Sequence, residues 1–524
     1  MVEIVIGAAP LSIADVVAVA RRGGRVRIHP DALRAVAQTR VLVDALADDT
    51  SPHYGISTGF GALATTAIAP ADRTRLQQSL IRSHAASSGP AVEDEVVRAL
   101  MLLRLRTLAT GRTGVRPVVV ETYAALLDAG IHPVIGEHGS LGCSGDLAPL
   151  SHVALALMGE GQVRVDGVVQ PAADALAAAG IAPVVLAEKE GLALVNGTDG
   201  MLGMLCLALD DLARLLDTAD LAAAMSVEGL LGTDAPFAAD LQALRPHAGQ
   251  AASARRIRGL LAGSPIVASH AGPEDTRVQD AYSLRCAPQV HGTARDTADH
   301  AARVADVELV SAIDNPVVTR DGRIVSNGNF HGAPIAAVLD FLAIVVADVA
   351  SMSERRTDRF LDPARSHGLP PFLAAEPGVD SGLMIAQYTQ AGIVSELKRL
   401  AAPASVDSIP SSAMQEDHVS MGWGAARKLR RAIDGLEQVL AIEVMTAARG
   451  IDLREPDAGE RTGAVVAAVR EHVPGAGPDR FLAPDIAAVR ALVASGALLA
   501  AASIHDLDHE SASAPVDAQG RSDR

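Results

Sequence analysis

Long apolar segments with helical spacing are the feature that most limits how this chain can fold. Hydrophobic residues make up 49% of the 524 residues and aromatic residues only 2%, so a core must be built mainly from Ala, Leu, Val and Ile. This composition favours helix over sheet. Several segments are apolar on most faces, which indicates burial in a large helical bundle. We expect long helices over residues 92–110, 198–217, 294–312, 332–356, 381–401, 418–449 and 485–503.

Composition also suggests how the chain is divided. Residues 1–110 show a mixed pattern of shorter elements and include the glycine-rich loop 54–61, so we expect an N-terminal domain with this loop mobile, followed by a helical-bundle domain over 111–504. Residues 245–277 are rich in Gly, Ala, Ser, His and Pro and predict a long connection. The polar residues 505–524 predict a disordered tail.

Charge and cysteine usage restrict the partners and the compartment. A net charge of −17 argues against nucleic acid or an anionic membrane surface. Cys143, Cys206 and Cys286 have no CxxC spacing, which suggests neither disulfides nor a zinc site. The N-terminus has no basic targeting region, and the most apolar stretch, 333–350, is interrupted by two aspartates. We therefore expect a cytoplasmic protein that needs no metal or nucleotide.

A segment of unusual chemistry lies at residues 139–152, with Cys143, Ser144 and Gly145 at its centre. If the amide nitrogen of Gly145 attacks the carbonyl of residue 143, a five-membered ring forms. Loss of two waters then turns Ser144 into an exocyclic methylidene, which is a strong electrophile. Glycine permits the tight fold that this attack requires, and holding the two groups in contact accelerates the closure. The alternative is a plain glycine-rich turn before a helix that begins near Asp146.

The fourteen residues of this segment closely resemble the signature of the aromatic amino acid ammonia-lyase family, and the resemblance extends over residues 5–503. The family cofactor is 4-methylidene-imidazol-5-one (MIO), formed from the chain itself. Most members have Ala where this chain has Cys143, but only the carbonyl of that residue reacts. The resemblance implies a mainly α fold, with a long central helical bundle shared with the fumarase and aspartase superfamily and a smaller N-terminal domain. It also implies a homotetramer with shared active sites.

Tyr54 lies in the sequence His-Tyr-Gly-Ile-Ser-Thr-Gly-Phe-Gly. A tyrosine beside a flexible loop can act as a movable acid or base if its neighbours lower its pKa from about 10. The alternative is an ordinary loop tyrosine. The resemblance makes Tyr54 the catalytic group that removes the β-proton of the substrate. The G-x-S-x-G pattern at 55–59 follows a poor strand, so we interpret it as a coincidence.

Gln279, Tyr282 and Arg285 are spaced by three residues, which places them on one face if the segment is helical. An arginine fork suits a carboxylate through two parallel hydrogen bonds, although a surface salt bridge is the simpler interpretation. The resemblance implies that Arg285 holds the substrate carboxylate. It places Tyr282 beside the electrophile as a catalytic residue and Gln279 in the substrate-binding set.

Three further residues match positions that line the substrate pocket in the family. Asn196 precedes a predicted helix and is also explained by an Asn-Gly turn. The resemblance places it beside the amino or carboxylate end of the substrate. Asn315, in Asp-Asn-Pro, and Phe330, in Gly-Asn-Phe-His-Gly, match the pocket lining, although Phe330 is equally explained as a core residue.

His84 and Glu416 bear on substrate choice, because both match the histidine-specific members of the family. An imidazole ring offers two nitrogens for hydrogen bonds, whereas a phenyl ring would leave a buried carboxylate unpaired. A satisfied core histidine and a solvated glutamate are the structural alternatives. Relatives specific for tyrosine or phenylalanine carry other residues at the glutamate position, and we therefore expect Glu416 to act in both binding and catalysis.

The resemblance predicts a carbon–nitrogen lyase that eliminates ammonia from L-histidine to give trans-urocanate, the first step of histidine degradation. Either the amino group or the imidazole ring of the substrate attacks the electrophile, and both routes stay open. The alternatives are a tyrosine or phenylalanine ammonia-lyase, or an aminomutase, with the same cofactor. A hydrolase with Cys143 as nucleophile lacks a Cys-His-Asn context, and a non-catalytic relative would have lost Ser144 or Tyr54.

Overall fold

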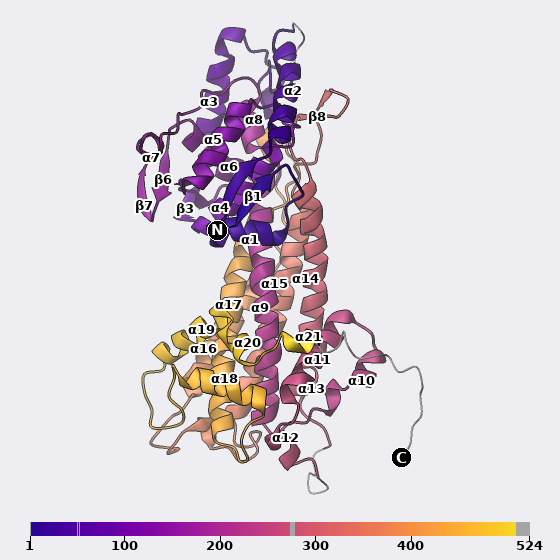
Figure 1. Ribbon diagram of the computed structural model, residues 1–524, viewed down its shortest axis with the longest axis vertical. Coiled ribbons are helices and arrows are strands. Elements are labelled where there is room, and N and C mark those ends of the chain that lie inside the picture. The colour runs from indigo at the N-terminus through magenta and orange to yellow at the C-terminus, as the bar shows by residue number, and fades with distance from the viewer. Residues whose placement is uncertain (1, 50, 52, 273–277, 510–524) are drawn as a thin grey trace. The chain divides into compact units, whose positions relative to one another are not determined.

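The computed structural model describes residues 2–49, 51, 53–272 and 278–509. The chain forms two compact units, each built from separate segments. The first unit comprises Met1–Asp210, His300–Phe341 and Pro403–Arg430, and the second comprises Asp211–Asp299, Leu342–Ala402 and Arg431–Arg524. Four long helices contain residues of both units: α9 (Asp199–Gly229), α14 (Ala287–Val310), α15 (Ala333–Leu361) and α17 (Gly422–Asp452) (Figure 1).

The first unit is mainly helical and carries small two- or three-stranded sheets. Strands β1 (Glu3–Ile6) and β2 (Arg25–Ile28) are parallel, and the other strand pairs are antiparallel. The remaining strands are β3 (Ser88–Ala91), β4 (His132–Pro133), β5 (Gly136–His138), β6 (Gln162–Val165), β7 (Val168–Pro171), β8 (Val317–Val318) and β9 (Ile324–Val325). The remaining helices are α1 (Ile13–Arg21), α2 (Pro30–Ala47), α3 (Arg73–His84), α4 (Asp94–Leu108), α5 (Pro117–Asp128), α6 (Leu147–Leu157), α7 (Ala172–Ala179) and α8 (Glu190–Val195).

Local sequence signals explain where several of these helices begin. The Ser12 hydroxyl accepts a hydrogen bond from the Asp15 amide at 3.2 Å, and the Asp15 carboxylate accepts one from the Ser12 amide at 2.9 Å, which is a capping box for α1. Helix α4 has acidic residues in its first turn and Arg106 in its last, as the helix dipole favours. Eleven of its side chains are buried, so α4 forms part of the core of the first unit.

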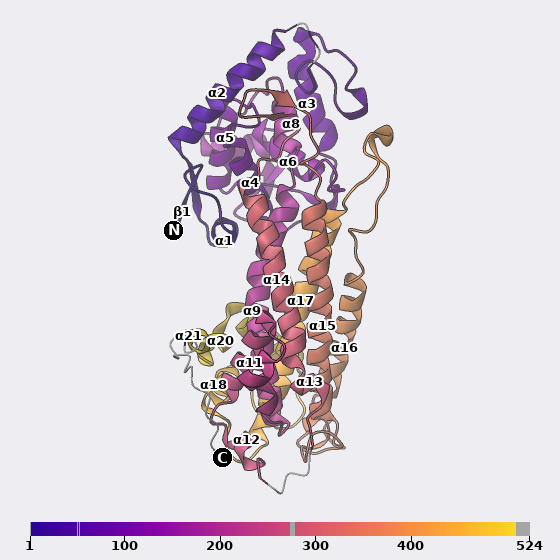
Figure 2. The ribbon, with the colours of Figure 1, turned by 90° about the vertical axis from the view of Figure 1, so that its right-hand side faces the viewer.

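Within its described residues, the second unit consists of helices and connecting loops and contains none of the strands β1–β9. Its portions of α9, α14, α15 and α17 run side by side (Figures 1 and 2). Ala, Leu, Val and Ile supply most of the buried side chains, as expected from the scarcity of aromatic residues. The shorter helices are α10 (Ala239–Ala243), α11 (Ala248–Leu261), α12 (Pro265–Ser269), α13 (Tyr282–Arg285), α16 (Met384–Leu400), α18 (Glu460–Arg470), α19 (Ala483–Ser495), α20 (Ala497–Ala501) and α21 (Asp506–His509).

Helices are present at all seven predicted positions, and most of their ends lie within about five residues of the predicted ones. Helix α9, however, ends twelve residues after the predicted end at 217, and α14 begins seven residues before the predicted start at 294. The segment 485–503 is divided into α19 and α20 at Gly496, whose φ of +75° ends the first helix. The predicted long connection over 245–277 is wrong, because α11 and α12 lie within it. Many Gly, Ala and Ser residues in this segment make the helical spacing of its buried positions hard to recognise in the sequence.

The sequence also predicts a domain boundary after residue 110 and a disordered tail over residues 505–524. Residue 110 falls inside the first unit, between α4 and α5, which pack against each other. The predicted tail, 505–524, begins instead with a helical turn, α21, whose Leu507 is buried. The remainder of the tail, 510–524, lies outside the described residues.

Two helical stretches, 190–229 and 333–361, are long and apolar enough to cross a membrane by length and composition. Their most apolar windows are 100% and 61% buried within the protein. Such burial is typical of core helices, and it agrees with the prediction that several apolar segments are buried in a large helical bundle.

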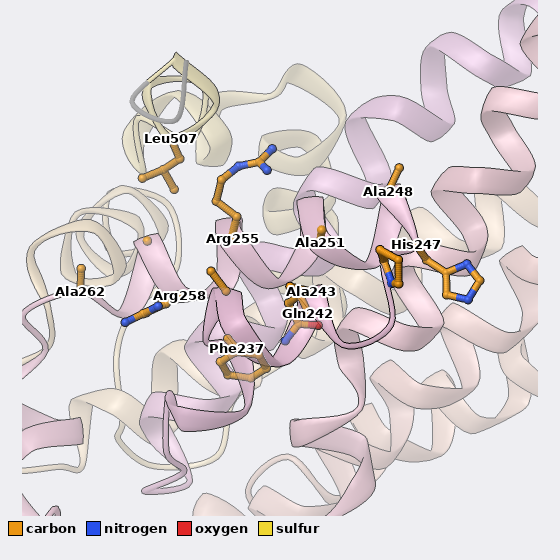
Figure 3. A pocket seen from close by; sticks show the side chains of 13 residues that line it. Phe237, Gln242, Ala243, His247, Ala248, Ala251, Arg255, Arg258, Ala262 and Leu507 are labelled. Carbon is orange, nitrogen blue, oxygen red and sulfur yellow. The ribbon is translucent and has the colours of Figure 1, made fainter. Parts of the chain in front are cut away.

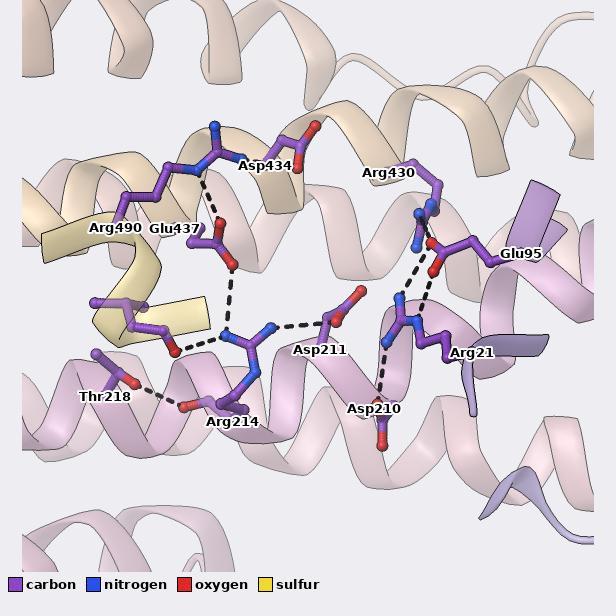
Figure 4. Close-up of polar contacts among 11 residues, drawn as sticks. Arg21, Glu95, Asp210, Asp211, Arg214, Thr218, Arg430, Asp434, Glu437 and Arg490 are labelled. Carbon is purple, nitrogen blue, oxygen red and sulfur yellow. Dashed lines mark hydrogen bonds and ion pairs between the residues drawn. The ribbon is translucent and has the colours of Figure 1, made fainter. Parts of the chain in front are cut away.

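Ion pairs connect the helices of each unit at its partly exposed edges (Figure 4). In the first unit, Arg21 contacts Glu95 at 2.7 Å and Asp210 at 3.1 Å, and Arg430 also contacts Glu95. In the second unit, Glu437 lies between two arginines, with Arg490 at 2.9 Å and Arg214 at 3.4 Å. Such pairs add little stability singly, and their main effect is to align the helices that carry them.

A fully buried ion pair lies in the core of the second unit. Arg356 of α15 donates two hydrogen bonds to Glu443 of α17, at 2.5 and 2.9 Å, and both side chains have no exposed surface. Ser226 of α9 donates a further hydrogen bond to Glu443 at 2.7 Å. The three helices are therefore connected by one polar cluster within an apolar core.

Glu443→Ala should lower the stability of the protein by about 3–5 kcal/mol, because it leaves the Arg356 charge buried without a partner. The double variant Arg356→Met/Glu443→Leu should lose much less, since it removes both charges together. Thermal denaturation followed by circular dichroism at fixed protein concentration measures both effects. Equal losses in the single and double variants would contradict the assignment.

Candidate active site

A cavity of about 680 Å³ in the first unit brings together six of the residues expected to form the active site. Loops supply most of the wall, and helices α3, α6 and α8 supply the rest. The six are Tyr54, His84, Ser144, Asn196, Asn315 and Glu416. Apolar side chains, including Leu63, Ile68, Leu76, Leu80, Leu192 and Val195, cover the surface between them.

The tripeptide Cys143-Ser144-Gly145 lies at this cavity, and its backbone turns at Gly145 in a conformation that glycine favours. Gly145 has a φ of +84°, a region that other residues rarely adopt. A Cβ atom added there would lie 2.2 Å from the carbonyl oxygen of Gly197, so no side chain fits. Cys143 is buried, whereas Ser144 is half-buried and lines the cavity. The residues present therefore fit an MIO group whose methylidene carbon would face the cavity.

Hydrogen bonds hold the segment that precedes the tripeptide. The carbonyl of Gly142 accepts from the Ser420 hydroxyl at 2.7 Å and from the Gly332 amide at 3.1 Å. The Met421 amide donates to the carbonyl of Leu141 at 2.9 Å. These partners lie more than 180 positions along the chain from the tripeptide, so its geometry depends on the folded unit.

Asp146, which follows the tripeptide, is fully buried and accepts three hydrogen bonds. They come from the amides of Gly200 at 2.9 Å and Met201 at 3.0 Å and from the Ser140 hydroxyl at 2.8 Å. Burial raises the pKa of Asp146 to about 7 in spite of these donors. Near neutral pH the Asp146 carboxyl therefore exchanges its proton easily, directly beside the tripeptide.

Tyr54 lies in a turn after α2, and its phenol oxygen accepts a hydrogen bond from the Gly61 amide at 3.3 Å. Burial raises the pKa of Tyr54; the hydrogen bond opposes this rise, and the charges of Glu416 and Asp314 add to it. Within one chain, therefore, burial raises the pKa of Tyr54 and the charged groups that act on the phenol are carboxylates, so the lowered pKa that a base at neutral pH requires is not produced by these neighbours.

Glu416 lies close to both the tripeptide and the predicted specificity residue. Its Oε2 atom accepts a hydrogen bond from the Cys143 thiol at 3.2 Å and one from the Ser411 hydroxyl at 3.3 Å. Burial lowers the pKa of His84, opposed by the Leu80 backbone and by the charge of Glu416. Burial, together with the hydrogen bond to Glu416, raises the pKa of the Cys143 thiol to about 11. A thiol held protonated in this way is a poor nucleophile, which counts against the hydrolase alternative.

Arg104 of α4 holds the asparagines of the cavity, and sequence reasoning missed it. Its guanidinium has no exposed surface and donates to the carbonyls of Ala193, Asn196 and Ile313 at 3.0–3.2 Å, with Asp199 at 2.8 Å. An arginine in the middle of the apolar run Met-Leu-Leu-Arg-Leu was the available signal, because a charge in such a run needs buried partners.

The two cavity asparagines also contact each other. The Asn196 side-chain amide donates to the carbonyl of Asn315 at 3.1 Å, and its Oδ1 atom is buried without a hydrogen-bond partner among the described residues. Behind Asn315, a fully buried pair joins Lys189 to Asp314 at 2.6 Å. The Asp314 carboxylate also accepts from the Asn315 amide at 2.8 Å. Asn196 therefore presents a free acceptor for a polar substrate group.

Four of the residues predicted to bind the substrate or act on it do not line this cavity. Gln279, Tyr282 and Arg285 belong to the second unit. Only Tyr282 and Arg285 are helical, in the four-residue helix α13, so the predicted single face does not include Gln279. The Arg285 guanidinium lies 4.8 Å from the centre of the Tyr282 ring, and that ring is 71% exposed. Phe330 is half-buried in the turn before α15.

A second cavity, of about 620 Å³, lies within the second unit (Figure 3). Arg255 and Leu507 lie on one side of it and Phe237 on the opposite side. No residue predicted for the active site lines it. Within the described residues, no group of three or more His, Cys, Asp and Glu side chains is placed to hold a metal ion.

The helical fold, the segment Cys143-Ser144-Gly145 at the cavity and the comparisons with known proteins together identify a carbon–nitrogen lyase. The model of one protein family, described as aromatic amino acid lyase, matches residues 11–471. The chain belongs to this family, and the predicted mainly α fold of the fumarase and aspartase superfamily is confirmed.

Individual relatives agree with this assignment. The chain is 62% identical to the histidine ammonia-lyase of Streptomyces coelicolor, over 96% of this chain and 98% of the relative. It is 61% identical to that of Streptomyces griseus, with the same coverage. The crystal structure of histidine ammonia-lyase from Trypanosoma cruzi has a TM-score of 0.88 at 38% identity, covering 96% and 95% of the two chains. A tyrosine aminomutase from Streptomyces globisporus has a TM-score of 0.90 at 37% identity, covering 96% and 98%.

The raised pKa of Asp146 predicts how stability depends on pH. The folded protein favours the protonated carboxyl, so the contribution of Asp146 to stability is lost as pH rises from about 4 to about 7. Asp146→Asn stays neutral and lacks this loss. The melting temperature of the wild type should therefore fall relative to that of the variant between pH 4.5 and 7 and then level off. The exposed Asp174→Asn serves as the control, and a difference that does not change with pH would contradict the assignment.

Proposed function

We propose that the protein eliminates ammonia from L-histidine to give trans-urocanate, as the first step of histidine degradation. The observation that carries this proposal is the single cavity where Ser144, Tyr54, His84 and Glu416 meet. Relatives that are 61–62% identical and named histidine ammonia-lyase support it.

The cofactor of this reaction is the MIO group formed from Cys143, Ser144 and Gly145. When present, it supplies an electrophilic carbon that no ordinary side chain offers. Gly145 allows the backbone to fold onto itself, and the hydrogen bonds to Gly142 restrict the loop so that nitrogen and carbonyl stay close. Asp146 is placed to take up and release the protons of the ring closure, because its pKa lies near 7.

Tyr54 is the base that removes the β-proton of the substrate. Its raised pKa in the single chain means that a positive charge must lower it in the complete site. Arg285 and the ammonium group of the substrate can provide this charge. Arg285 also holds the substrate carboxylate, with Tyr282 and Gln279 beside it, and Asn196 offers its free Oδ1 atom to the amino group.

Histidine is selected by the polar end of the cavity. Glu416 accepts a hydrogen bond from one nitrogen of the imidazole, and His84, whose lowered pKa keeps it neutral, pairs with the other. A phenyl or phenol ring would leave these groups buried and unpaired, which costs binding energy. The rival function is a tyrosine or phenylalanine ammonia-lyase or an aminomutase, to which the tyrosine aminomutase structure points by fold.

We further propose a cytoplasmic homotetramer in which Gln279, Tyr282 and Arg285 of one copy complete the cavity of another. Three observations favour this arrangement. These residues lie in a different unit from the cavity, the Tyr282 ring is exposed, and the Arg285 Nε atom is buried without a hydrogen-bond partner among the described residues. Phe330 would contribute to the pocket wall in the same assembly.

Ser144→Ala should abolish the near-ultraviolet absorbance of the conjugated ring and reduce urocanate formation by at least about a thousandfold. The intact wild-type chain should weigh two waters, about 36 Da, less than its sequence predicts, and the variant should not. Ser495→Ala, on the exposed end of α19, is the matched control. A fully active Ser144→Ala variant would exclude the cofactor. Formation of coumarate, cinnamate or a β-amino acid in preference to urocanate would favour the rival function.

Mixed tetramers test the shared site. Ser144→Ala and Arg285→Ala should each be inactive alone. Co-expression should restore about a quarter of the wild-type activity. With random assembly, about one site in four combines an intact Ser144 from one copy with an intact Arg285 from another. Activity assays on the co-purified mixture, with two different affinity tags, measure this recovery. If the mixture stays inactive, both residues act within one chain.

A further inference from the structure

We propose that the Cys143 thiol is a positioning residue for Glu416, so that this chain uses the side chain of its cofactor-forming tripeptide in substrate recognition. The inference rests on the proposed function, in which Glu416 binds the substrate ring. Ring closure does not use the side chain of Cys143, and the proposal gives this side chain a role.

The contact is specific in its geometry. The Cys143 thiol donates to Oε2 of Glu416 at 3.2 Å, across 273 positions of the chain. The Ser411 hydroxyl donates to the same oxygen at 3.3 Å. Among the described residues, no hydrogen bond from another side chain reaches Oε1. One carboxylate oxygen is thus fixed from within the protein, and the other stays available to a ligand in the cavity.

The thiol can act on the substrate only through Glu416. Cys143 is 6% exposed and does not line the cavity, whereas Glu416 does. Ring closure uses the carbonyl carbon of residue 143 and leaves its Cβ and Sγ atoms unchanged. The side chain is therefore still attached beside Glu416 after the cofactor has formed.

The charges around the pair keep the thiol in the donor form. Burial and the neighbouring carboxylate raise the thiol pKa to about 11, so the proton stays on sulfur throughout the neutral range. The other titratable groups that interact with Glu416 are Tyr54 and His84, both of which line the cavity. Neither contributes a hydrogen bond to the carboxylate, so Cys143 and Ser411 are its two side-chain donors.

Loss of one of two donors should allow the carboxylate to rotate, which weakens binding of the substrate ring more than the elimination step. For Cys143→Ala we expect KM for L-histidine to rise about threefold to tenfold and kcat to change less than about twofold. Cys143→Ser keeps a donor and should restore most of the wild-type KM. Cys206→Ala, buried in α9 with no contact to the site, is the matched control.

Each variant must first be shown to contain the cofactor, by the mass deficit of two waters and by the near-ultraviolet absorbance. If Cys143→Ala carries the cofactor and its KM equals that of the wild type, the positioning role is overturned while the proposed function stands. If the wild type carries the cofactor and forms no urocanate, the proposed function fails instead.

A second measurement tests the pair without relying on turnover. Glu416→Gln keeps the shape of the side chain and removes its charge, which should lower the pKa of the Cys143 thiol. Iodoacetamide should then modify Cys143 at pH 8.5 about threefold faster or more than in the wild type. Peptide mass mapping distinguishes Cys143 from the other two cysteines, and Cys286 in the same sample reports on general reactivity. Equal rates in wild type and Glu416→Gln would show that the two groups do not interact, and would overturn the inference.

Discussion

The close contact between the backbones of Gly145 and Gly197 is the constraint on which the site depends. With 2.2 Å between a would-be Cβ and the Gly197 carbonyl, only glycine can occupy position 145. The same approach brings the Asp146 amide within 2.7 Å of that carbonyl. The buried Asp146 carboxyl points at the start of α9, where it accepts hydrogen bonds from the amides of Gly200 and Met201. The backbone conformation of the tripeptide therefore depends on packing as well as on sequence.

Buried charges maintain this packing. Arg104 donates to the carbonyls of Ala193, Asn196 and Ile313, and so fixes three segments that meet at the cavity. Lys189 and Asp314 hold the segment before Asn315 in the same way. Each charge has lost its water and is retained because partners surround it. Such groups fix the segments that carry the cavity asparagines, and Asp314 adds to the rise in the pKa of Tyr54 that burial causes.

Much of the fold followed from local patterns, and half of the predicted site residues, which the family resemblance supplied, line one cavity. The seven helices were visible because apolar residues recur at helical spacing, and the tripeptide because its residue types match one chemistry. The segment 245–277 was misjudged because small residues conceal periodicity, although α11 and α12 are there. Arg104 was missed because its partners are up to 209 positions away and are backbone carbonyls, which leave no mark in a sequence. The pKa of Tyr54 could not be predicted, because burial raises it and the carboxylates that add to this rise come from distant segments.

The sequence by itself determined the chemistry available to this protein: a serine between a small residue and a glycine, a loop tyrosine, and an arginine suited to a carboxylate. Those properties belong to residue types and short spacings. Only the tertiary structure decided which groups act together. It joined Ser144, Tyr54, His84 and Glu416 at one cavity, set the Cys143 thiol against Glu416, and left Arg285 in the other unit. Packing brings distant segments of the chain together. Burial and the charges that packing places nearby then shift the pKa of each group and so decide whether it is protonated.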